Sequence, residues 1–206
     1  MLALYKRALS PVAWIQLVGG FFCWALAVVL MVKSGLGLGP WDLFHQGFGL
    51  LIGRPMGLAS IYVSIVIIVC SLKLRVWPGP GSLANMLLIG VFIDMLMPLV
   101  PSSPLVSLHL LYFGSGILLI GLGSGTYIGA RMGAGPRDAL MLALSERLGW
   151  SIRRVRMGIE MSVLVAGWLL GGKVGLGTLA YALLIGPSVQ FGLRLRGALP
   201  EPNRSR

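Results

Sequence analysis

The sequence predicts an all-α membrane protein of six transmembrane helices. The helices form two inverted three-span repeats, each with a short half-helix that begins at a Gly-Pro-x-Asp motif. Three observations support this fold class. The 206-residue chain is 56% hydrophobic and only 11% charged, with a mean hydropathy of +0.88, whereas a soluble domain carries about 25% charged residues. The sequence also repeats itself at a constant offset, and its basic residues are distributed as in a multi-pass protein.

The internal repeat contains no gaps. Gly-Leu-Gly-Pro-Trp-Asp at residues 37–42 returns as Gly-Ala-Gly-Pro-Arg-Asp at residues 133–138, an offset of 96. The chain therefore reads as a single membrane domain, residues 1–206, with repeat 1 over residues 12–97 and repeat 2 over residues 108–193. Because each repeat holds an odd number of spans, we expect the second copy to be inverted relative to the first.

Six long apolar segments are predicted to span the membrane, since about 20 apolar residues cross a bilayer as a helix. The second is weakened by Lys73 and Arg75 at its end, and the fifth contains Glu160. The first apolar segment is longer than the apolar core of a signal peptide, which has about 7–15 residues, and no small-x-small cleavage site follows it. We therefore expect it to be a true membrane span. The predicted spans are residues 12–32, 57–76, 82–101, 107–128, 155–172 and 177–193.

A short helix is predicted within each repeat, from Pro40 to Gly53 and from Pro136 to Gly149. Proline suits the first turn of a helix, where its missing N–H would have no partner. About 13 residues give a length of roughly 20 Å, which is too short to span. The glycines before each proline allow an extended stretch that brings the helix start toward the bilayer centre, inside the protein or beside a water-lined cavity. We interpret both as re-entrant half-helices with converging N-termini; the alternative is an amphipathic helix at each membrane surface.

The basic residues predict a topology with both termini in the cytoplasm. The net charge is +11, and only Lys33, Arg54 and Lys173 fall in predicted outer segments. This asymmetry follows the positive-inside rule, and the basic tail from Arg194 is expected to contact anionic lipid rather than nucleic acid. The 14 basic residues of the predicted cytoplasmic segments are Lys6, Arg7, Lys73, Arg75, Arg131, Arg137, Arg147, Arg153, Arg154, Arg156, Arg194, Arg196, Arg204 and Arg206.

Polar residues in or beside apolar segments are the candidate pathway residues, because ionisable groups are costly in a membrane. Asp42 and Asp138 are related by the repeat, and we expect them to line a central pathway as a pseudo-symmetric pair; the alternative is that each only caps its helix. Asp94 in the third span corresponds to Gln190 in the sixth. This correspondence favours a common buried site, with a hydrogen bond between helices as the alternative.

Three further residues are candidates for the same pathway. Arg137 makes the second motif chemically different from the first, and near the bilayer centre it would favour an anion; a topology charge is the alternative. His45 lies one turn after Asp42. The two residues are interpreted as a proton-linked pair, and the alternative is that His45 is a histidine held only by hydrogen bonds. Glu160 lies one turn after Arg156, which favours an ion pair.

No enzyme, metal or cofactor motif is present. The sequence has no Cys-x-x-Cys, His-Glu-x-x-His, P-loop or dinucleotide-binding pattern. Cys23 and Cys70 fall within predicted spans, where they are expected to be buried apolar side chains. We therefore expect no cofactor and no metal.

Several motifs together resemble the YczE/YitT family of bacterial integral membrane proteins, and the resemblance extends from about residue 35 to residue 190. The chain stops after its last predicted span, so it looks closer to the YczE-like branch than to members with a soluble C-terminal domain. The resemblance implies a location in the bacterial inner membrane and implies no substrate or reaction. The motifs are Gly-x-Gly-Pro-Trp-Asp at 37–42, Leu-Ile-Gly-x-x-x-Asp at 88–94, Gly-Ala-Gly-Pro-Arg-Asp at 133–138, Arg-x-x-x-Glu at 156–160 and Gly-x-Gly-Thr at 175–178.

The leading functional hypothesis is a small secondary transporter or channel, with a pathway for an unknown solute or ion at the repeat interface. A second hypothesis is a regulatory or scaffold membrane protein whose basic cytoplasmic loop, Arg147 to Arg156, binds a partner or anionic lipid. A third is an intramembrane aspartyl enzyme, which would need the carboxylates of Asp42 and Asp138 within hydrogen-bond reach. Six short spans leave little room for a pathway in one chain, so a homodimer is also considered.

Overall fold

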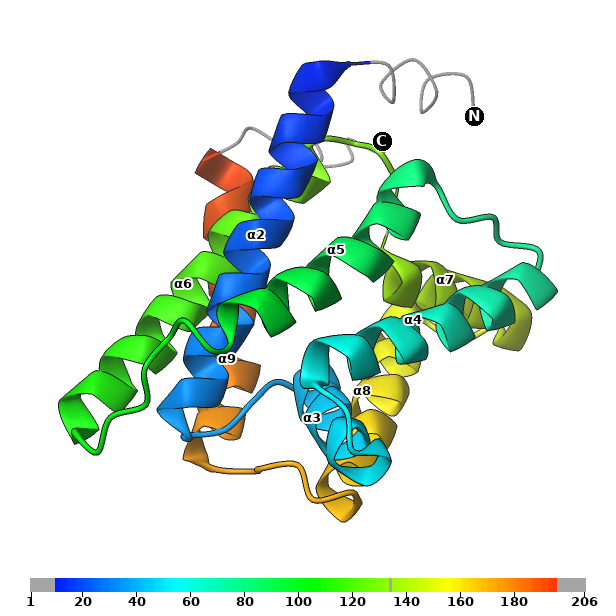
Figure 1. The fold of residues 1–206 in the computed structure, drawn as a ribbon. Helices are drawn as coiled ribbons and strands as arrows, with labels where there is room; N and C mark the ends of the chain where they lie inside the picture. Colours follow the sequence, from blue (N-terminus) through cyan, green and yellow to red (C-terminus); the bar gives the residue numbers. More distant parts are fainter. Residues whose placement is uncertain (1–9, 134, 196–206) are drawn as a thin grey trace.

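The computed structural model describes residues 10–133 and 135–195, apart from the side chains of residues 138, 139 and 142. This part of the chain is all-helical, as predicted. The ends of the chain, with Lys6, Arg7 and the basic tail beyond residue 195, lie outside the described residues. The helices are α2 (Pro11–Ser34), α3 (Pro40–Ile52), α4 (Met56–Lys73), α5 (Pro80–Leu96), α6 (Val106–Gly129), α7 (Pro136–Leu148), α8 (Ile152–Leu169) and α9 (Leu176–Leu195) (Figure 1).

Four of these helices, α2, α4, α6 and α9, are long and apolar enough to cross a membrane. The other two predicted spans differ for physical reasons. Helix α5 has 17 residues, or about 26 Å, against a hydrocarbon core of about 30 Å. Helix α8 has 18 residues but carries three arginines and Glu160. The described residues therefore form a multi-pass membrane protein. Of the six predicted spans, four have the length and composition of a membrane span, and α5 and α8 do not.

The helix boundaries repeat at the same offset as the sequence. The predicted half-helices are α3 and α7, which begin at Pro40 and Pro136 and have 13 residues each. Each is followed by a glycine in the left-handed region, Gly53 at φ 61° and Gly149 at φ 65°, a conformation that favours glycine at a helix end. Helices α4 and α8 also have equal length.

The helices form two groups that lie side by side and are joined by the packing of α4 against α5 (Figure 1). Helices α2, α5, α6 and α9 pack together through α2–α5, α2–α6 and α6–α9 contacts. Helices α3, α4, α7 and α8 pack through α3–α4, α3–α8, α4–α7 and α7–α8 contacts. Each group thus contains helices from both repeats, and the repeats are intertwined rather than separate.

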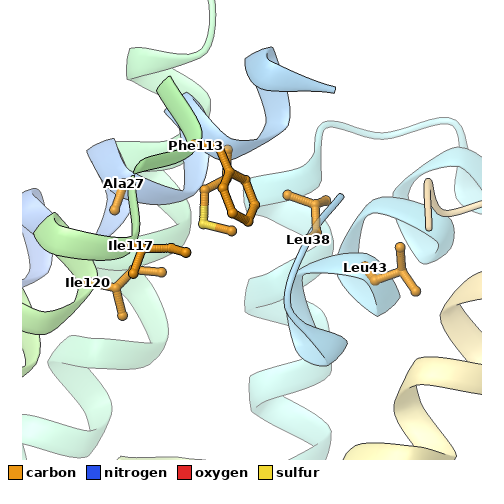
Figure 2. Close-up of a cluster of buried hydrophobic side chains, with 7 residues drawn as sticks. Ala27, Leu38, Leu43, Phe113, Ile117 and Ile120 are labelled. Atoms are coloured by element: carbon orange, nitrogen blue, oxygen red, sulfur yellow. The ribbon is translucent and has the colours of Figure 1, made fainter. Parts of the chain in front are cut away.

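Glycines bring the long helices into close contact. A Cβ on Gly20 of α2 would lie 2.9 Å from the Gly123 carbonyl oxygen of α6, and one on Gly121 would overlap Ser188 of α9. Such small residues drive helix association where no water is expelled. The apolar cluster beside these contacts joins α2, α6 and the start of α3; Figure 2 shows Phe113, Ile117 and Ile120 of α6, Ala27 of α2, Leu38 before α3 and Leu43 within it.

Two reciprocal hydrogen bonds join the repeats. The Gly177 N–H at the start of α9 donates to the Leu36 carbonyl at 2.8 Å, and the Gly81 N–H at the start of α5 donates to the Met132 carbonyl at 3.0 Å. Donors and acceptors are both 96 positions apart. The loop before each half-helix is therefore held by the last helix of the other repeat.

The repeats differ where the last two helices of each meet. In repeat 1, a Cβ on Gly57 of α4 would overlap the Gly90 carbonyl of α5, so the two backbones touch. In repeat 2 the corresponding residues are Arg153 and Gly186, and a Cβ on Gly186 would meet nothing within 4 Å. Because arginine replaces the contact glycine, the described residues of α8 and α9 have no packing comparable to that of α4 and α5.

A central cavity between the repeats

A cavity of about 260 Å³ lies between the two helix groups. All eight described helices contribute to its lining; α2 and α3 supply one residue each, Trp24 and Trp41, and the others supply two or more. The lining shows the repeat directly, because six positions of repeat 1 and their six counterparts in repeat 2 all face it. These pairs are Trp24 and Ile120, Trp41 and Arg137, Ser60 and Arg156, Ser64 and Glu160, Asn85 and Tyr181, and Ile89 and Ile185.

The two sides of the cavity differ in charge. All the charged lining residues among the described side chains come from repeat 2, namely Arg137, Arg156 and Glu160. The Arg156 Nε donates to Glu160 Oε1 at 2.8 Å, and these side chains are 62% and 37% exposed. The predicted ion pair therefore forms, and it lies at the rim, while Arg137 lies deeper.

Arg137 is held against aromatic side chains at the start of α7. Its guanidinium carbon lies 4.6 Å from the centre of the Trp41 ring and 5.9 Å from that of Trp24. Stacking of this kind stabilises a cation and fixes the plane of the guanidinium group. The contact with Trp41 also brings the first turns of α3 and α7 together at the cavity wall.

Arg137 also fixes the tautomer of His45. Its Nη2 lies 3.4 Å from His45 Nε2. A guanidinium N–H can only donate, so Nε2 accepts, and a neutral His45 carries its proton on Nδ1. That nitrogen lies 4.0 Å from Asp42 Oδ1, too far for a direct hydrogen bond.

Asp42 and His45 are buried behind the cavity wall, 3% and 1% exposed. Asp42 Oδ1 and His45 Nδ1 have no hydrogen-bond partner among the described residues. Buried polar atoms without hydrogen-bond partners cost free energy. These two atoms could therefore take up a proton or a further hydrogen bond. Asp42, His45 and Arg137 thus form one constellation that crosses the repeat interface.

Asp94 lies elsewhere and binds the start of α4. Its Oδ1 accepts from the Gly57 N–H at 2.7 Å and its Oδ2 from the Leu58 N–H at 2.8 Å. These are first-turn amides that a helix cannot satisfy itself. Gln190 is exposed on α9, so the expected common buried site of Asp94 and Gln190 does not form. The reason is the loss of the α8–α9 contact described above.

The Asp138 side chain lies outside the described residues. The pairing of Asp42 with Asp138 therefore stays a prediction, as does the distance that an aspartyl enzyme would require. Within the described part of the chain, no three His, Cys, Asp or Glu side chains come together as metal ligands would.

The sequence reasoning overlooked several lining residues: Trp24, Ser60, Ser64, Asn85 and Tyr181. Individually these residues are unremarkable in apolar helices. The signal that could have identified them is the alignment of the two repeats, in which Ser60 and Ser64 correspond to the charged residues Arg156 and Glu160. Of the six repeat-related pairs that line the cavity, three are polar in both repeats: Ser60 and Arg156, Ser64 and Glu160, and Asn85 and Tyr181.

Long apolar helices that pack through glycines, with polar groups turned to a central cavity, define an integral multi-pass membrane protein. The chain belongs to the "Family of unknown function (DUF6198)", whose family model matches residues 12–194. It is 39% identical over 182 residues to the "Uncharacterized membrane protein YczE" of Bacillus subtilis (strain 168), covering 87% of this chain and 85% of the relative. The predicted YczE-like membership is thus confirmed.

Two further relatives cover similar shares of the chain. An "Uncharacterized protein" of Haemophilus influenzae (strain ATCC 51907 / DSM 11121 / KW20 / Rd) is 36% identical over 172 residues, 84% of this chain and 79% of the relative. The "Uncharacterized protein YyaS" of Bacillus subtilis (strain 168) is 29% identical over 172 residues, 81% of this chain and 85% of the relative. No solved structure matches the chain.

Proposed function

We propose that the protein is a small secondary transporter or channel whose pathway runs through the central cavity. The observation that carries this proposal is the lining of one cavity by six pairs of repeat-related positions. Transporters built from inverted repeats place their solute at the repeat interface, where equivalent positions of the two halves meet. Arginine, glutamate, serine and asparagine would be costly at these positions if the helices only packed against one another in the membrane.

The proposal includes an inverted arrangement of the repeats. The reciprocal bonds of Gly177 to Leu36 and of Gly81 to Met132 support a pseudo-two-fold axis, because a two-fold interface makes each contact twice. Three spans in each repeat would place this axis in the membrane plane. Helices α5 and α8 then complete the six spans, with the charged face of α8 turned to the cavity and both termini in the cytoplasm of a bacterial inner membrane.

The proposal also includes re-entrant half-helices. The contact of Arg137 with Trp41 supports it, because the first turns of α3 and α7 meet at the cavity rather than lying on separate surfaces. Their N-termini present free amides and the positive end of the helix dipole. In this arrangement Asp42 and His45 couple proton or cation binding to solute occupancy.

A cavity-blocking variant tests the proposal. Ser64 lines the cavity and is 8% exposed, so Ser64→Trp should fill it. Purified protein in proteoliposomes would be screened for solute-dependent swelling with a panel of small metabolites and ions. We expect Ser64→Trp to abolish the swelling, while Leu183→Trp, at a position 77% exposed on α9, preserves it. Full flux through a folded Ser64→Trp variant would contradict a central pathway.

Absence of any flux through the wild-type protein would favour a regulatory role instead. Residues 146–154, from the last turn of α7 to the first turn of α8, are exposed and include Arg147, Arg153 and Arg154. Such a basic segment suits anionic lipid or an acidic partner. Binding of this segment to anionic vesicles would then be the property to measure.

A further inference from the structure

We infer that the coupling ion of the proposed pathway is a proton and that it binds Asp42 at Oδ1. This inference rests on the proposed function and names the ion that the function leaves open. Asp42 Oδ1 and His45 Nδ1 are buried side-chain atoms without a hydrogen-bond partner in the described part of the chain. Both residues lie in the first two turns of α3 and neither lines the cavity. The protein thus encloses a carboxylate oxygen that the described side chains leave unsatisfied.

The hydrogen-bond geometry makes His45 a donor toward this oxygen. Arg137 donates to His45 Nε2 at 3.4 Å, so a neutral His45 carries its proton on Nδ1. Nδ1 lies 4.0 Å from Asp42 Oδ1. An N–H group cannot ligate a cation, and hard cations such as Ca²⁺ and Mg²⁺ take about six or more oxygen ligands. Among the described residues no three His, Cys, Asp or Glu side chains come together to supply such ligands, which favours a proton over a metal cation.

The surroundings of Asp42 are closely packed. The rings of Trp41 and Phe44 lie 6.3 and 6.5 Å from that of His45, and a Cβ on Gly39, before α3, would lie 2.6 Å from the Tyr181 ring of α9. A hydrated ion would lose its water here and gain the carboxylate of one residue in return. A proton needs no such space, because it leaves hydronium on the aqueous side and forms the O–H bond of a carboxylic acid.

The charged and titratable groups around Asp42 come from three other helices. Arg137 of α7 acts on Asp42 through its charge, while Tyr181 of α9 and Arg156 and Glu160 of α8 line the cavity. The cavity-lining residues of α4, which also packs against α3, are serines and do not titrate in this range. Burial stabilises the neutral acid, whereas a nearby positive charge stabilises the carboxylate. Proton uptake removes a negative charge beside Arg137, so it changes the electrostatic potential at the cavity wall and with it the binding of a solute.

Infrared difference spectroscopy of the purified full-length protein detects this proton directly, through the C=O band of a carboxylic acid. The chain has only six carboxylate side chains, so single substitutions can assign each band. As the pH is lowered from about 9 to about 4, we expect a band that is absent in Asp42→Asn and retained in Glu146→Gln. Glu146 is exposed on α7, and its own band should appear at lower pH. A band that appears no earlier than that of Glu146, or that is lost in Asp138→Asn and not in Asp42→Asn, would overturn the inference.

A comparison of salts distinguishes a proton from a cation at the same oxygen. The titration would be repeated in sodium, potassium and choline chloride at equal ionic strength. We expect the Asp42 band to appear at the same pH in all three salts. A shift to lower pH by about one unit or more in sodium or potassium chloride would show that the cation competes with the proton, and would overturn the inference.

Variants of Arg137 test the site even if Asp42→Asn fails to fold. Arg137→Gln removes a positive charge that acts on Asp42, so the band should appear about 1–3 pH units higher. Arg137→Lys keeps the charge and should shift the band less. Arg153→Gln removes an exposed charge of α8 and should leave the band unchanged. An unshifted band in folded Arg137→Gln would overturn the inference.

The two proposals fail in different ways. Protonation of Asp42 without flux in proteoliposomes supports the proton site and counts against a transport pathway. Flux that Ser64→Trp blocks, but that Asp42→Asn carries with the same pH dependence as the wild-type protein, supports the pathway and overturns the proton at Asp42 as its coupling ion.

Discussion

Arg131, just after the end of helix α6, has a backbone conformation that suits glycine. Its φ is 52°, while its repeat counterpart Gly35 has a φ of 65° after α2. The same exchange occurs at Arg75, with φ 64°, whose counterpart is Gly171 at φ 89°. The left-handed region costs a non-glycine residue about 1–2 kcal/mol. Both arginines belong to the predicted cytoplasmic set, so a need for topology charges would explain why the chain tolerates this strain.

Arg131→Gly should therefore stabilise the fold. Glycine removes the left-handed strain but adds freedom to the unfolded chain, so we expect the free energy of unfolding to rise by up to about 1 kcal/mol. Thermal unfolding in detergent measures the change. Gly35→Ala is the matched control: its Cβ would meet nothing within 4 Å, so a loss of about 1 kcal/mol would come from φ alone. A loss of stability in Arg131→Gly would contradict the strain argument.

Asp42 offers a second test at the scale of one residue. Asn retains the shape of the side chain and caps a helix nearly as well, so a purely structural Asp42 would lose about 1 kcal/mol or less in Asp42→Asn and keep its function. If Asp42 carries a proton or cation beside His45, the variant should fold normally and lose transport. Flux in proteoliposomes and size-exclusion profiles measure the two properties. Glu146→Gln, an exposed carboxylate of α7, should change neither.

Full flux with an unchanged pH dependence in Asp42→Asn would refute the coupling role. The same substitution at Asp138 tests the predicted pair, since the repeat places it at the same position of α7. Loss of flux in only one of the two variants would show that the pair is not functionally symmetric.

At the scale of the helix, one side chain decides whether two helices meet. Gly57 lets α4 approach the backbone of α5, and Asp94 then satisfies the Gly57 and Leu58 amides. Arg153 stands at the corresponding position of α8, and no comparable contact with α9 exists among the described residues. The repeat 1 side of the lining thus comes from two helices in backbone contact, while on the repeat 2 side the exposed ion pair of Arg156 and Glu160 forms part of the lining.

Asp94→Ala tests whether the hydrogen bonds of Asp94 hold α4 to α5. The variant leaves two amides of α4 without an acceptor, each worth about 1–3 kcal/mol when buried. We expect a loss of at least about 2 kcal/mol in the free energy of unfolding, and a smaller loss in Asp94→Asn, which keeps one acceptor oxygen. Gln190→Ala at the exposed counterpart should stay within about 0.5 kcal/mol. Equal effects at Asp94 and Gln190 would mean that Asp94 does not hold α4 to α5.

The sequence predicts those elements whose signals are local. Both half-helices begin at a proline and end before a glycine as predicted, because a missing N–H and a left-handed φ act within one turn. For Asp94, the hydrogen bond between helices that was the alternative role is the one that forms, but its partners were beyond such reasoning, since Gly57 and Leu58 lie 37 and 36 residues away. Which helices touch depends on packing in three dimensions. For the same reason the Trp41–Arg137 stack was not predicted, although both residues were noted in the motif.

At the scale of the whole molecule, the proposed pathway requires one topology, in which the two half-helices enter from opposite faces. Arg54 and Trp150 occupy corresponding exposed positions in the turns after α3 and α7, 96 residues apart. Single cysteines at these positions, in a background that lacks Cys23 and Cys70, should react with a membrane-impermeant maleimide from opposite sides of intact cells. The positive-inside distribution predicts that Arg54→Cys reacts from outside.

Trp150→Cys should react only after the membrane is permeabilised, and the free sulfhydryl in unfolded protein provides the control for complete labelling. The result bears on the pathway itself. Equivalent positions on opposite faces would mean that the six residue pairs lining the cavity approach it from the two sides of the membrane, as alternating access requires. Labelling of both cysteines from the same side would contradict the inverted repeat. The cavity would then face one side only, and the protein could bind a solute there without carrying it across.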